Sequence, residues 1–454
     1  MKNALVEGEA SDILVEDGMI AAVSRRSEGR GGPSLQLGDP ASQAPPASQA
    51  SQAPQASQAS QARGALAAGE VFDAKGMAAL PSLANAHTHA AMTLLRGIAE
   101  DMDLETWLTK AIWPREARLG PEDIYWGTRL AALEMISTGT SLCQDMYLDP
   151  AAQARAARDS GMRFVVNYAL IDGMDEERGR AQRKACEAFF DALGGEDYGP
   201  RVRFNLAAHS VYATCPSSLR WLGDFARERG LTLHIHLGET RAEVDSCLAR
   251  TGMRPSFYLD SLGFLGPNLA AAHALWLDEG EWDLLAERGA AVVHNPASNM
   301  KLASGPAFDF QAATSRGIRV LLGTDGAASN NGLDLFADMK LAALLQKHGY
   351  RDPRRLDLGR LFEAAGRAGH EFFGVPGGRI EAGAAADFIL VDLDRPSMVP
   401  CHNLRANMVY SGGGGAVDSM VCDGKVVLRH GVVEGAQEIL DHVRKSAVSV
   451  TKLV

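Results

Sequence analysis

The sequence predicts an α/β protein: a (β/α)8 TIM-type barrel with a small β-sandwich domain formed from both chain ends. Between residues 81 and 375, apolar runs of strand length alternate with helical patterns, and eight such units can be counted. Buried strands separated by helices are typical of a parallel sheet, and eight units are the number that closes a barrel. On both sides of this region, the pattern changes to short strands of alternating polarity.

Residues 1–80 are assigned to the N-terminal part of the β-sandwich. Residues 1–32 alternate apolar and polar side chains around a Glu-Asp-Gly turn, and short strands are expected again at 71–73 and 77–80. Between them, residues 40–62 contain only Pro, Ala, Ser and Gln. A segment of this composition cannot bury enough apolar surface to offset its conformational entropy, so we expect a disordered loop with no role in chemistry.

The barrel is assigned to residues 81–375. Its helices are marked by their ends, since 121–137 and 216–229 both begin with proline and are soon followed by glycine. After a first strand that runs into His87, the expected strands are 141–143, 164–170, 202–207, 231–237, 269–274, 290–294 and 318–323. Residues 376–454, with short strands at 388–391, 419–422 and 425–428, are assigned to the C-terminal part of the β-sandwich.

Composition excludes several classes of protein. The 454 residues are 46% hydrophobic and 22% charged, as in ordinary globular proteins. The net charge of -11 argues against nucleic acid or an anionic membrane as the partner. Six isolated cysteines without a CxxC motif favour a reducing compartment, and neither a signal peptide nor an apolar span is recognisable. We therefore expect a cytoplasmic protein that acts on a small molecule and forms a homo-oligomer.

Five side chains with metal-binding chemistry fall at predicted strand ends: His87, His89, His236, His273 and Asp325. In a parallel barrel all strands end at one face, and residues two apart on a strand share a side. The set predicts one divalent ion, zinc by preference with iron as the alternative, and leaves room for a water molecule. The fourth strand ends in His209, with no lysine that could be carboxylated to bridge a second ion.

Glu239 follows His236 by three residues, just beyond the end of a predicted strand. There it could carry protons between an activated water and a ring or leaving nitrogen. The alternative interpretation is an ordinary glutamate at a helix N-terminus, where the helix dipole favours negative charge.

Several motifs taken in order resemble the amidohydrolase superfamily, and within it the branch of 5'-methylthioadenosine/S-adenosylhomocysteine deaminases. The similarity covers nearly the whole chain apart from the Ala-Ser-Gln repeats. The motifs are PSLANAHTH at 81–89, HLGET at 236–240, VHNPASNMKLASG at 293–305 and LGTDGAASNN at 322–331.

The resemblance implies roles for individual residues. The implied metal ligands are His87, His89, His236 and Asp325, and the implied catalytic residues are Glu239, His273 and Asp325. Substrate contacts are implied for Glu116 at the ribose hydroxyls and for His209, Ser329 and Glu239 at the nucleoside. Arg180 corresponds to an arginine at the far end of the substrate, with Arg178 close enough to take its place. Tyr168 replaces a second family arginine, which predicts weaker recognition of an amino-acid carboxylate.

The predicted function is hydrolytic deamination of a 5'-modified adenosine to the inosine derivative and ammonia. Candidate substrates are methylthioadenosine, S-adenosylhomocysteine, 5'-deoxyadenosine and adenosine. The alternative is another amidohydrolase acting on a ring C–N or C–Cl bond, such as a guanine- or cytosine-type deaminase or a triazine hydrolase. Glu239 favours deamination, because ammonia needs a proton to leave and chloride does not. A catalytically silent metal- or nucleoside-binding protein is the alternative from another class.

Overall fold

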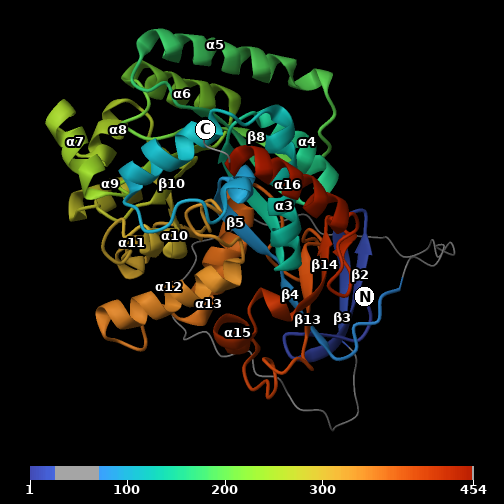
Figure 1. The fold of residues 1–454 in the computed structure, drawn as a ribbon. Helices are drawn as coiled ribbons and strands as arrows, with labels where there is room; N and C mark the ends of the chain where they lie inside the picture. Colours follow the sequence, from blue (N-terminus) through green and yellow to red (C-terminus); the bar gives the residue numbers. More distant parts are fainter. Residues whose placement is uncertain (26–70, 452–454) are drawn as a thin grey trace, which may run out of the picture.

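Eight parallel strands form the centre of the molecule in a computed structural model, which describes residues 1–25 and 71–451 (Figure 1). Each strand is hydrogen-bonded to the next in chain order, from β5 to β12. Their bounds are β5 Leu83–Thr88, β6 Thr140–Tyr147, β7 Arg163–Leu170, β8 Val202–Ala208, β9 Leu233–Leu237, β10 Leu269–His273, β11 Ala291–His294 and β12 Val320–Leu322. The first and last strands meet where Asp325 N–H donates to the carbonyl of His87 at 2.9 Å. The predicted barrel is confirmed, and it is nearly closed.

Strand residues alternate between the barrel interior and the surrounding helices. On β10, Ala270 and Ala272 belong to an interior cluster, whereas Leu269 and Ala271 pack in the larger core beneath the helices. This period of two brings every second side chain to the inner surface. The same alternation decides which strand-end residues can reach a common site.

Helices surround the strands, and the predicted helices 121–137 and 216–229 are present with those bounds. The helices of the barrel layer are α3 Pro121–Ser137, α4 Pro150–Ser160, α5 Glu176–Ala192, α6 Pro216–Arg229, α7 Arg241–Thr251, α8 Pro255–Ser261, α9 Glu279–Arg288, α10 Pro296–Lys301, α11 Phe310–Ser315, α12 Leu335–Tyr350, α13 Leu358–Ala365 and α14 Arg367–Phe372. Gly230 stops α6 with a φ of 65°, which a residue without Cβ adopts at little cost. No helix in the described ranges is long and apolar enough to span a bilayer.

The two chain ends combine in one seven-stranded sheet with the order β15-β14-β13-β4-β1-β2-β3. The strands are β1 Ala4–Val6, β2 Glu9–Glu16, β3 Met19–Arg25, β4 Met77–Pro81, β13 Phe388–Asp392, β14 Val417–Cys422 and β15 Lys425–Leu428. The sheet curls back on itself, since the turn at Gly18 lies against the turn at Gly424, and it encloses Ile13, Ile20 and Phe388. The predicted small β-domain from both ends is confirmed, whereas the 40–62 segment lies outside the described residues.

An ionic cluster joins this sheet to the amino-terminal end of the barrel. Arg163, which begins β7, donates to Asp387 at 2.8 and 3.3 Å and to Asp423 at 2.8 Å. Asp387 is completely buried, and it also accepts the N–H of Asp423 at 2.6 Å. The carboxyl ends of the strands, on the opposite side of the barrel, remain free to form a site.

The C-terminal helix α16 (Ala436–Thr451) was not predicted from the sequence. Helix α16 lies beside α3 (Figure 1). Ile439 and Val443 pack against Leu94, and the ring of His442 stacks on that of Trp126 in α3, with ring centroids 3.9 Å apart. Helix α16 is therefore part of the layer that covers the barrel. Short helices complete the described chain: η1 Ala90–Leu95, α1 Leu104–Thr106, η2 Trp107–Ile112, α2 Trp113–Glu116, η3 Leu193–Gly195, α15 Leu404–Asn407, η4 Met408–Gly412 and η5 Gly414–Ala416.

Candidate active site

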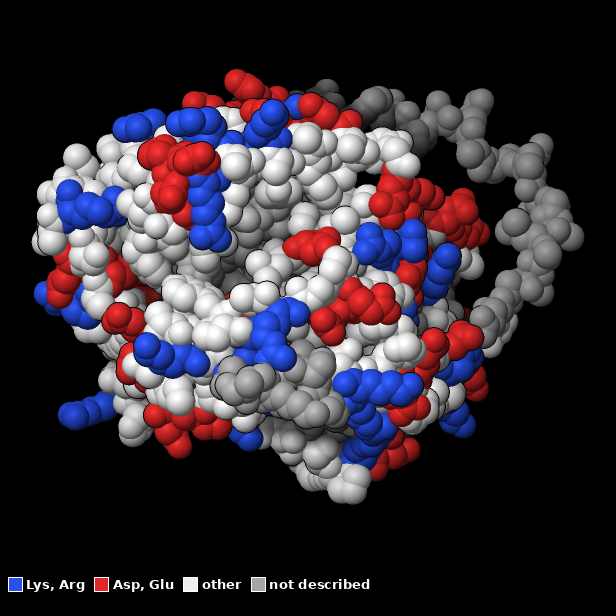
Figure 2. Space-filling model, turned by 45° about the horizontal axis from the view of Figure 1, so that its top comes forward, with Lys and Arg blue, Asp and Glu red and all other residues white. Residues whose placement is uncertain are grey.

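A cavity of about 530 Å³ lies at the carboxyl ends of the barrel strands. The predicted site residues in its lining are His89, Glu116, His209, His236, Glu239, His273, Asp325 and Ser329. On the face drawn in Figure 2, basic and acidic side chains are interspersed and form no continuous patch of one sign. Most of the predicted residues in the cavity lining come from strand ends that lie far apart in the sequence.

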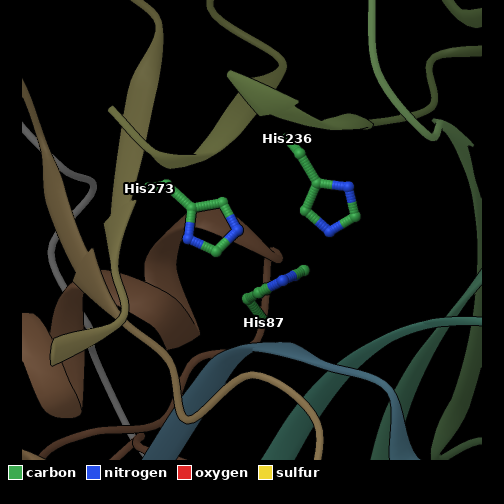
Figure 3. Close-up of side chains that lie close together, drawn as sticks. All are labelled: His87, His236 and His273. Carbon is green, nitrogen blue, oxygen red and sulfur yellow. The ribbon is translucent and has the colours of Figure 1, made fainter. Parts of the chain in front are cut away.

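Three histidines from three strands point toward one another at the floor of this cavity. His87 of β5, His236 of β9 and His273 of β10 have ring nitrogens within 4.8 Å of one another (Figure 3). A second set, His87, His89 and Asp325, meets the same distance limit. Asp325 Oδ1 lies 3.4 Å from His87 Nε2 and 3.3 Å from His89 Nε2. Imidazole nitrogens and one carboxylate oxygen therefore converge on a single point.

Hydrogen bonds at the outer ring nitrogens decide which atoms face that point. An Nδ1 that lies against an oxygen acceptor carries the proton, so the Nε2 of the same ring keeps its lone pair. These bonds run from His89 to the Met146 carbonyl at 2.5 Å, from His236 to the His209 carbonyl at 2.8 Å and from His273 to Asn299 Oδ1 at 2.8 Å. The Nε2 atoms of all three rings thus face the centre. Although burial acts in the opposite direction, contact with Asp325 raises the pKa of His89 to about 9, so a bound ion would replace the proton on this ring.

His87 also turns an Nε2 lone pair toward the centre, and here the hydrogen-bond partner of Nδ1 is another histidine, His234. Its Nδ1 lies 2.7 Å from Nε2 of His234, whose own Nδ1 lies 2.7 Å from the carbonyl of Ala270. His234 must donate to that carbonyl, so its Nε2 accepts the proton of His87 Nδ1. His87 Nε2 is buried and has no hydrogen-bond partner among the described residues. Burial is also the main reason that the pKa of His87 is lowered to about 4, which keeps the ring neutral.

The donor set fits a divalent metal ion. Neutral imidazole nitrogens and an ionised carboxylate are ligands that zinc and similar ions accept. Although burial acts in the opposite direction, contacts with His87 and His89 hold the pKa of Asp325 well below its usual range. Asp325 and His273 also have positive φ angles of 63° and 74°. Non-glycine residues rarely adopt this conformation, which is concentrated at functional sites.

Glu239 lies next to the converging donor atoms, where its carboxyl group contacts His273 and Ser304. Its Oε2 lies 3.7 Å from His273 Nε2, and its Oε1 accepts the hydroxyl proton of Ser304 at 3.2 Å. The side chain is buried, and burial raises its pKa. A carboxyl group with a raised pKa can both take up and release a proton near neutral pH.

Glu116 lies in the cavity wall formed by the segment after β5. It ends α2, and the neighbouring side chains Leu104, Trp107 and Trp113 make this wall largely apolar. Burial raises the pKa of Glu116, and the hydroxyl of Tyr147 acts in the opposite direction.

Two further residues that are expected to contact the substrate line the cavity. His209 lies in the lining, and burial lowers its pKa to about 3, so its ring is neutral. Ser329, in the loop after β12, is also in the lining, and its hydroxyl donates to the Gly326 carbonyl at 3.1 Å.

The structure distinguishes the positions of three residues that the sequence placed near the far end of the substrate. Arg178 lines the cavity, whereas Arg180 is not among the lining residues. Tyr168 packs against Phe189 of α5, with ring centroids 5.4 Å apart, and the next residue, Ala169, lines the cavity. Tyr168, which stands where the resemblance expects a second arginine, therefore faces the helix layer and not the cavity.

Sequence reasoning also missed His234, Ser304 and Asn299, which support the site from outside the cavity. A signal for His234 was present, since it precedes His236 by two positions and must share its side of the strand. Ser304 and Asn299 carry no such pattern, because their contacts with Glu239 and His273 depend on how the loop after β11 folds.

A parallel barrel with histidine and aspartate donors at its strand ends is typical of hydrolases that activate water on a divalent metal. The chain belongs to the amidohydrolase family, whose match spans residues 78–427.

Two relatives in sequence are deaminases. The chain is 43% identical over 382 residues to the 5'-deoxyadenosine deaminase of Methanoregula boonei, covering 84% of this chain and 86% of that protein. It is 41% identical over 376 residues to 5-methylthioadenosine/S-adenosylhomocysteine deaminase 1 of Archaeoglobus fulgidus, covering 83% and 88%. The resemblance drawn from the motifs is confirmed.

Two solved structures extend the comparison. An adenosine deaminase from Xanthomonas campestris with bound zinc is similar at a TM-score of 0.77 and 33% identity, covering 83% of this chain and 87% of that one. The atrazine chlorohydrolase of Arthrobacter aurescens has a TM-score of 0.81 at 23% identity, covering 99% of both chains. The second likeness concerns the fold alone.

Proposed function

We propose that this protein is a zinc-dependent hydrolytic deaminase of 5'-modified adenosines, which converts the 6-amino group to a carbonyl and releases ammonia. The observation that carries the proposal is the position of Glu239. Its carboxyl group is buried in the cavity, 3.7 Å from His273 Nε2, and it is not one of the histidine and aspartate groups that could hold a metal ion. The deaminases among its relatives support the same chemistry.

The ion would be held by His87, His89, His236 and Asp325, whose donor atoms converge from β5, β9 and the loop after β12. When bound, such an ion makes a water molecule acidic enough to act as a nucleophile near neutral pH. His273 and Asp325 would orient that water toward C6 of the purine.

Glu239 would move the protons. Its carboxyl group takes a proton from the attacking water and delivers it to ring N1. Water adds at C6, the bond from C6 to the amino nitrogen breaks, and the nitrogen leaves as ammonia after receiving a proton. The reaction consumes one water and yields the inosine derivative.

Substrate binding would be divided along the cavity. Glu116 would accept hydrogen bonds from the ribose hydroxyls, and His209 and Ser329 would contact the nucleoside. The cavity lining also includes Leu148, Ile171 and Arg178. An apolar wall suits a methyl or methylthio group, so we propose that 5'-deoxyadenosine and methylthioadenosine are preferred, with Arg178 available to a charged tail.

The test is ammonia release from adenosine, 5'-deoxyadenosine, methylthioadenosine and S-adenosylhomocysteine, with a chlorotriazine as the comparison substrate. We expect kcat/KM to be highest for the uncharged 5'-modified nucleosides. Turnover of the chlorotriazine alone would favour a dechlorinating hydrolase and contradict the proposal. Assembly as a homo-oligomer stays a prediction that sedimentation in solution can test.

A further inference from the structure

The turn that carries Glu239 is anchored by a second buried carboxylate, Glu243 of α7. Oε1 of Glu243 accepts the N–H of Gly238 at 2.9 Å, and Oε2 accepts the N–H of Glu239 at 3.0 Å. Only 4% of Glu243 is exposed. Both oxygens of Glu243 therefore accept hydrogen bonds from the main chain of the turn.

The opposite side of the turn is fixed as well. The carbonyl of Gly238 accepts the N–H groups of Leu275 and Trp276 at 3.1 and 2.9 Å. These residues belong to the loop that follows His273 at the end of β10. Gly238 has a φ of 58°, which suits glycine and lets its N–H and carbonyl point to these two different partners. The turn that contains Glu239 and the loop that follows His273 are thus joined by main-chain hydrogen bonds.

This use of Glu243 departs from the usual role of a glutamate at its position. In a capping box the glutamate at the third helical position bonds the N–H of the residue that caps the helix. Thr240 caps α7 and accepts the N–H of Glu243 at 3.1 Å, but Glu243 itself reaches past Thr240 to the two preceding residues.

The ordinary arrangement is present at the next long helix. In α9, Glu281 bonds the N–H of its own cap, Asp278, at 3.2 Å, and it also accepts the N–H of Ser256 at 3.0 Å. Glu281 is completely buried and likewise accepts two main-chain N–H groups. Glu281 differs from Glu243 in also accepting a hydrogen bond from Arg254 Nε at 2.7 Å. It does not bond the turn of Glu239, so it is a control for the loss of a buried carboxyl group that accepts main-chain N–H groups.

We propose that Glu243 is a positioning residue for Glu239: it fixes the main chain of the turn so that the Glu239 carboxyl stays at proton-transfer distance from the reacting atoms. The inference rests on the proposed function, in which Glu239 carries the proton. Displacement of a reacting group by about 1 Å can cost about 100-fold in rate, so loss of this anchor should be visible in turnover.

The test compares Glu243→Gln with Glu281→Gln in the full-length, metal-loaded protein. A glutamine amide has the same size but offers one acceptor and one donor, so it cannot accept both N–H groups. For Glu243→Gln we expect faster hydrogen exchange at the amides of Gly238 and Glu239 and an unchanged metal content. We also expect kcat to fall by about 10-fold to 100-fold, with KM within about twofold.

A double variant shows whether the effect passes through Glu239. If Glu243 acts by placing Glu239, adding Glu243→Gln to Glu239→Gln should change the residual kcat by less than about twofold, because coupled residues are not additive. Multiplication of the two losses would overturn the inference.

Other results also decide the matter. Unchanged exchange or unchanged kcat in Glu243→Gln would overturn the inference, as would an equal loss of kcat in Glu281→Gln. Should Glu243→Gln not fold, Glu243→Asp keeps the carboxyl group but is one methylene too short to reach both amides, and the same losses are expected. Absence of ammonia release from the wild-type protein would contradict the proposed function, whereas amide exchange tests the anchor separately.

Discussion

His234 accepts a hydrogen bond from His87 across 2.7 Å and so determines which nitrogen of His87 faces the metal centre. Groups that orient a metal ligand in this way typically contribute 10-fold to 100-fold to metal affinity. We expect His234→Leu to fold but to bind zinc about 10-fold to 100-fold more weakly, as measured by competition with a chelator.

The chain offers a control for this experiment. His294 on β11 is also completely buried, but it stacks on Phe308 at 4.6 Å, and neither ring nitrogen has a hydrogen-bond partner among the described residues. His294→Leu should leave zinc affinity unchanged. Equal weakening in both variants would show that the loss comes from packing and not from orientation of His87.

The role of Glu239 can be separated from metal binding. Glu239→Gln keeps the size of the side chain but cannot carry a proton, so kcat should fall by about 100-fold to 10,000-fold while the metal content stays at the wild-type value. Activity assays and metal analysis on the same preparation measure both quantities. Loss of the ion in this variant would make Glu239 a ligand.

Glu116 should matter only for substrates that carry a ribose. Hydrogen bonds to an ionised group contribute about 1.5 to 3 kcal/mol each, which corresponds to about 10-fold to 150-fold in kcat/KM per bond lost. Glu116→Ala is expected to reduce kcat/KM for adenosine by at least that factor and to leave turnover of free adenine nearly unchanged. A parallel loss on adenine would instead indicate a damaged site.

Two arginines close together on α5 allow a matched test of the far end of the cavity. Arg178 lines the cavity and Arg180 does not. Arg178→Ala should lower kcat/KM for S-adenosylhomocysteine by about 10-fold, because one charge-assisted contact to its carboxylate is lost. The same variant should leave 5'-deoxyadenosine unaffected, and Arg180→Ala should change neither substrate. The reverse pattern would restore Arg180 as the contact.

The barrel and most of its site could be predicted because both depend on local patterns. Apolar runs mark buried strands, and the ends of parallel strands meet at one face, so the histidines at those ends could be grouped without a structure. His87 and His89, two positions apart, were a weak signal alone, and they gained weight from His236, His273 and Asp325 at later strand ends.

The remaining features depend on contacts that no local pattern records. Tyr168 and Ala169 are neighbours on β7, and a shift of one residue exchanges the cavity for the helix layer. Arg178 and Arg180 differ only in which side of α5 faces the cavity. The C-terminal helix was missed because its apolar side is covered by α3 and η1, which the sequence alone does not place beside it.

The strand order of the seven-stranded sheet affects how the chain folds during synthesis. Strand β4 lies between β1, near the start of the chain, and β13, which is made only after the whole barrel. Domains generally begin to fold while later residues are still being synthesised, and an unpaired strand edge invites association with other chains. A nascent chain that has not reached Phe388 holds such an edge on β4. Ribosome-bound or prematurely ended chains should therefore be the species that need chaperones most.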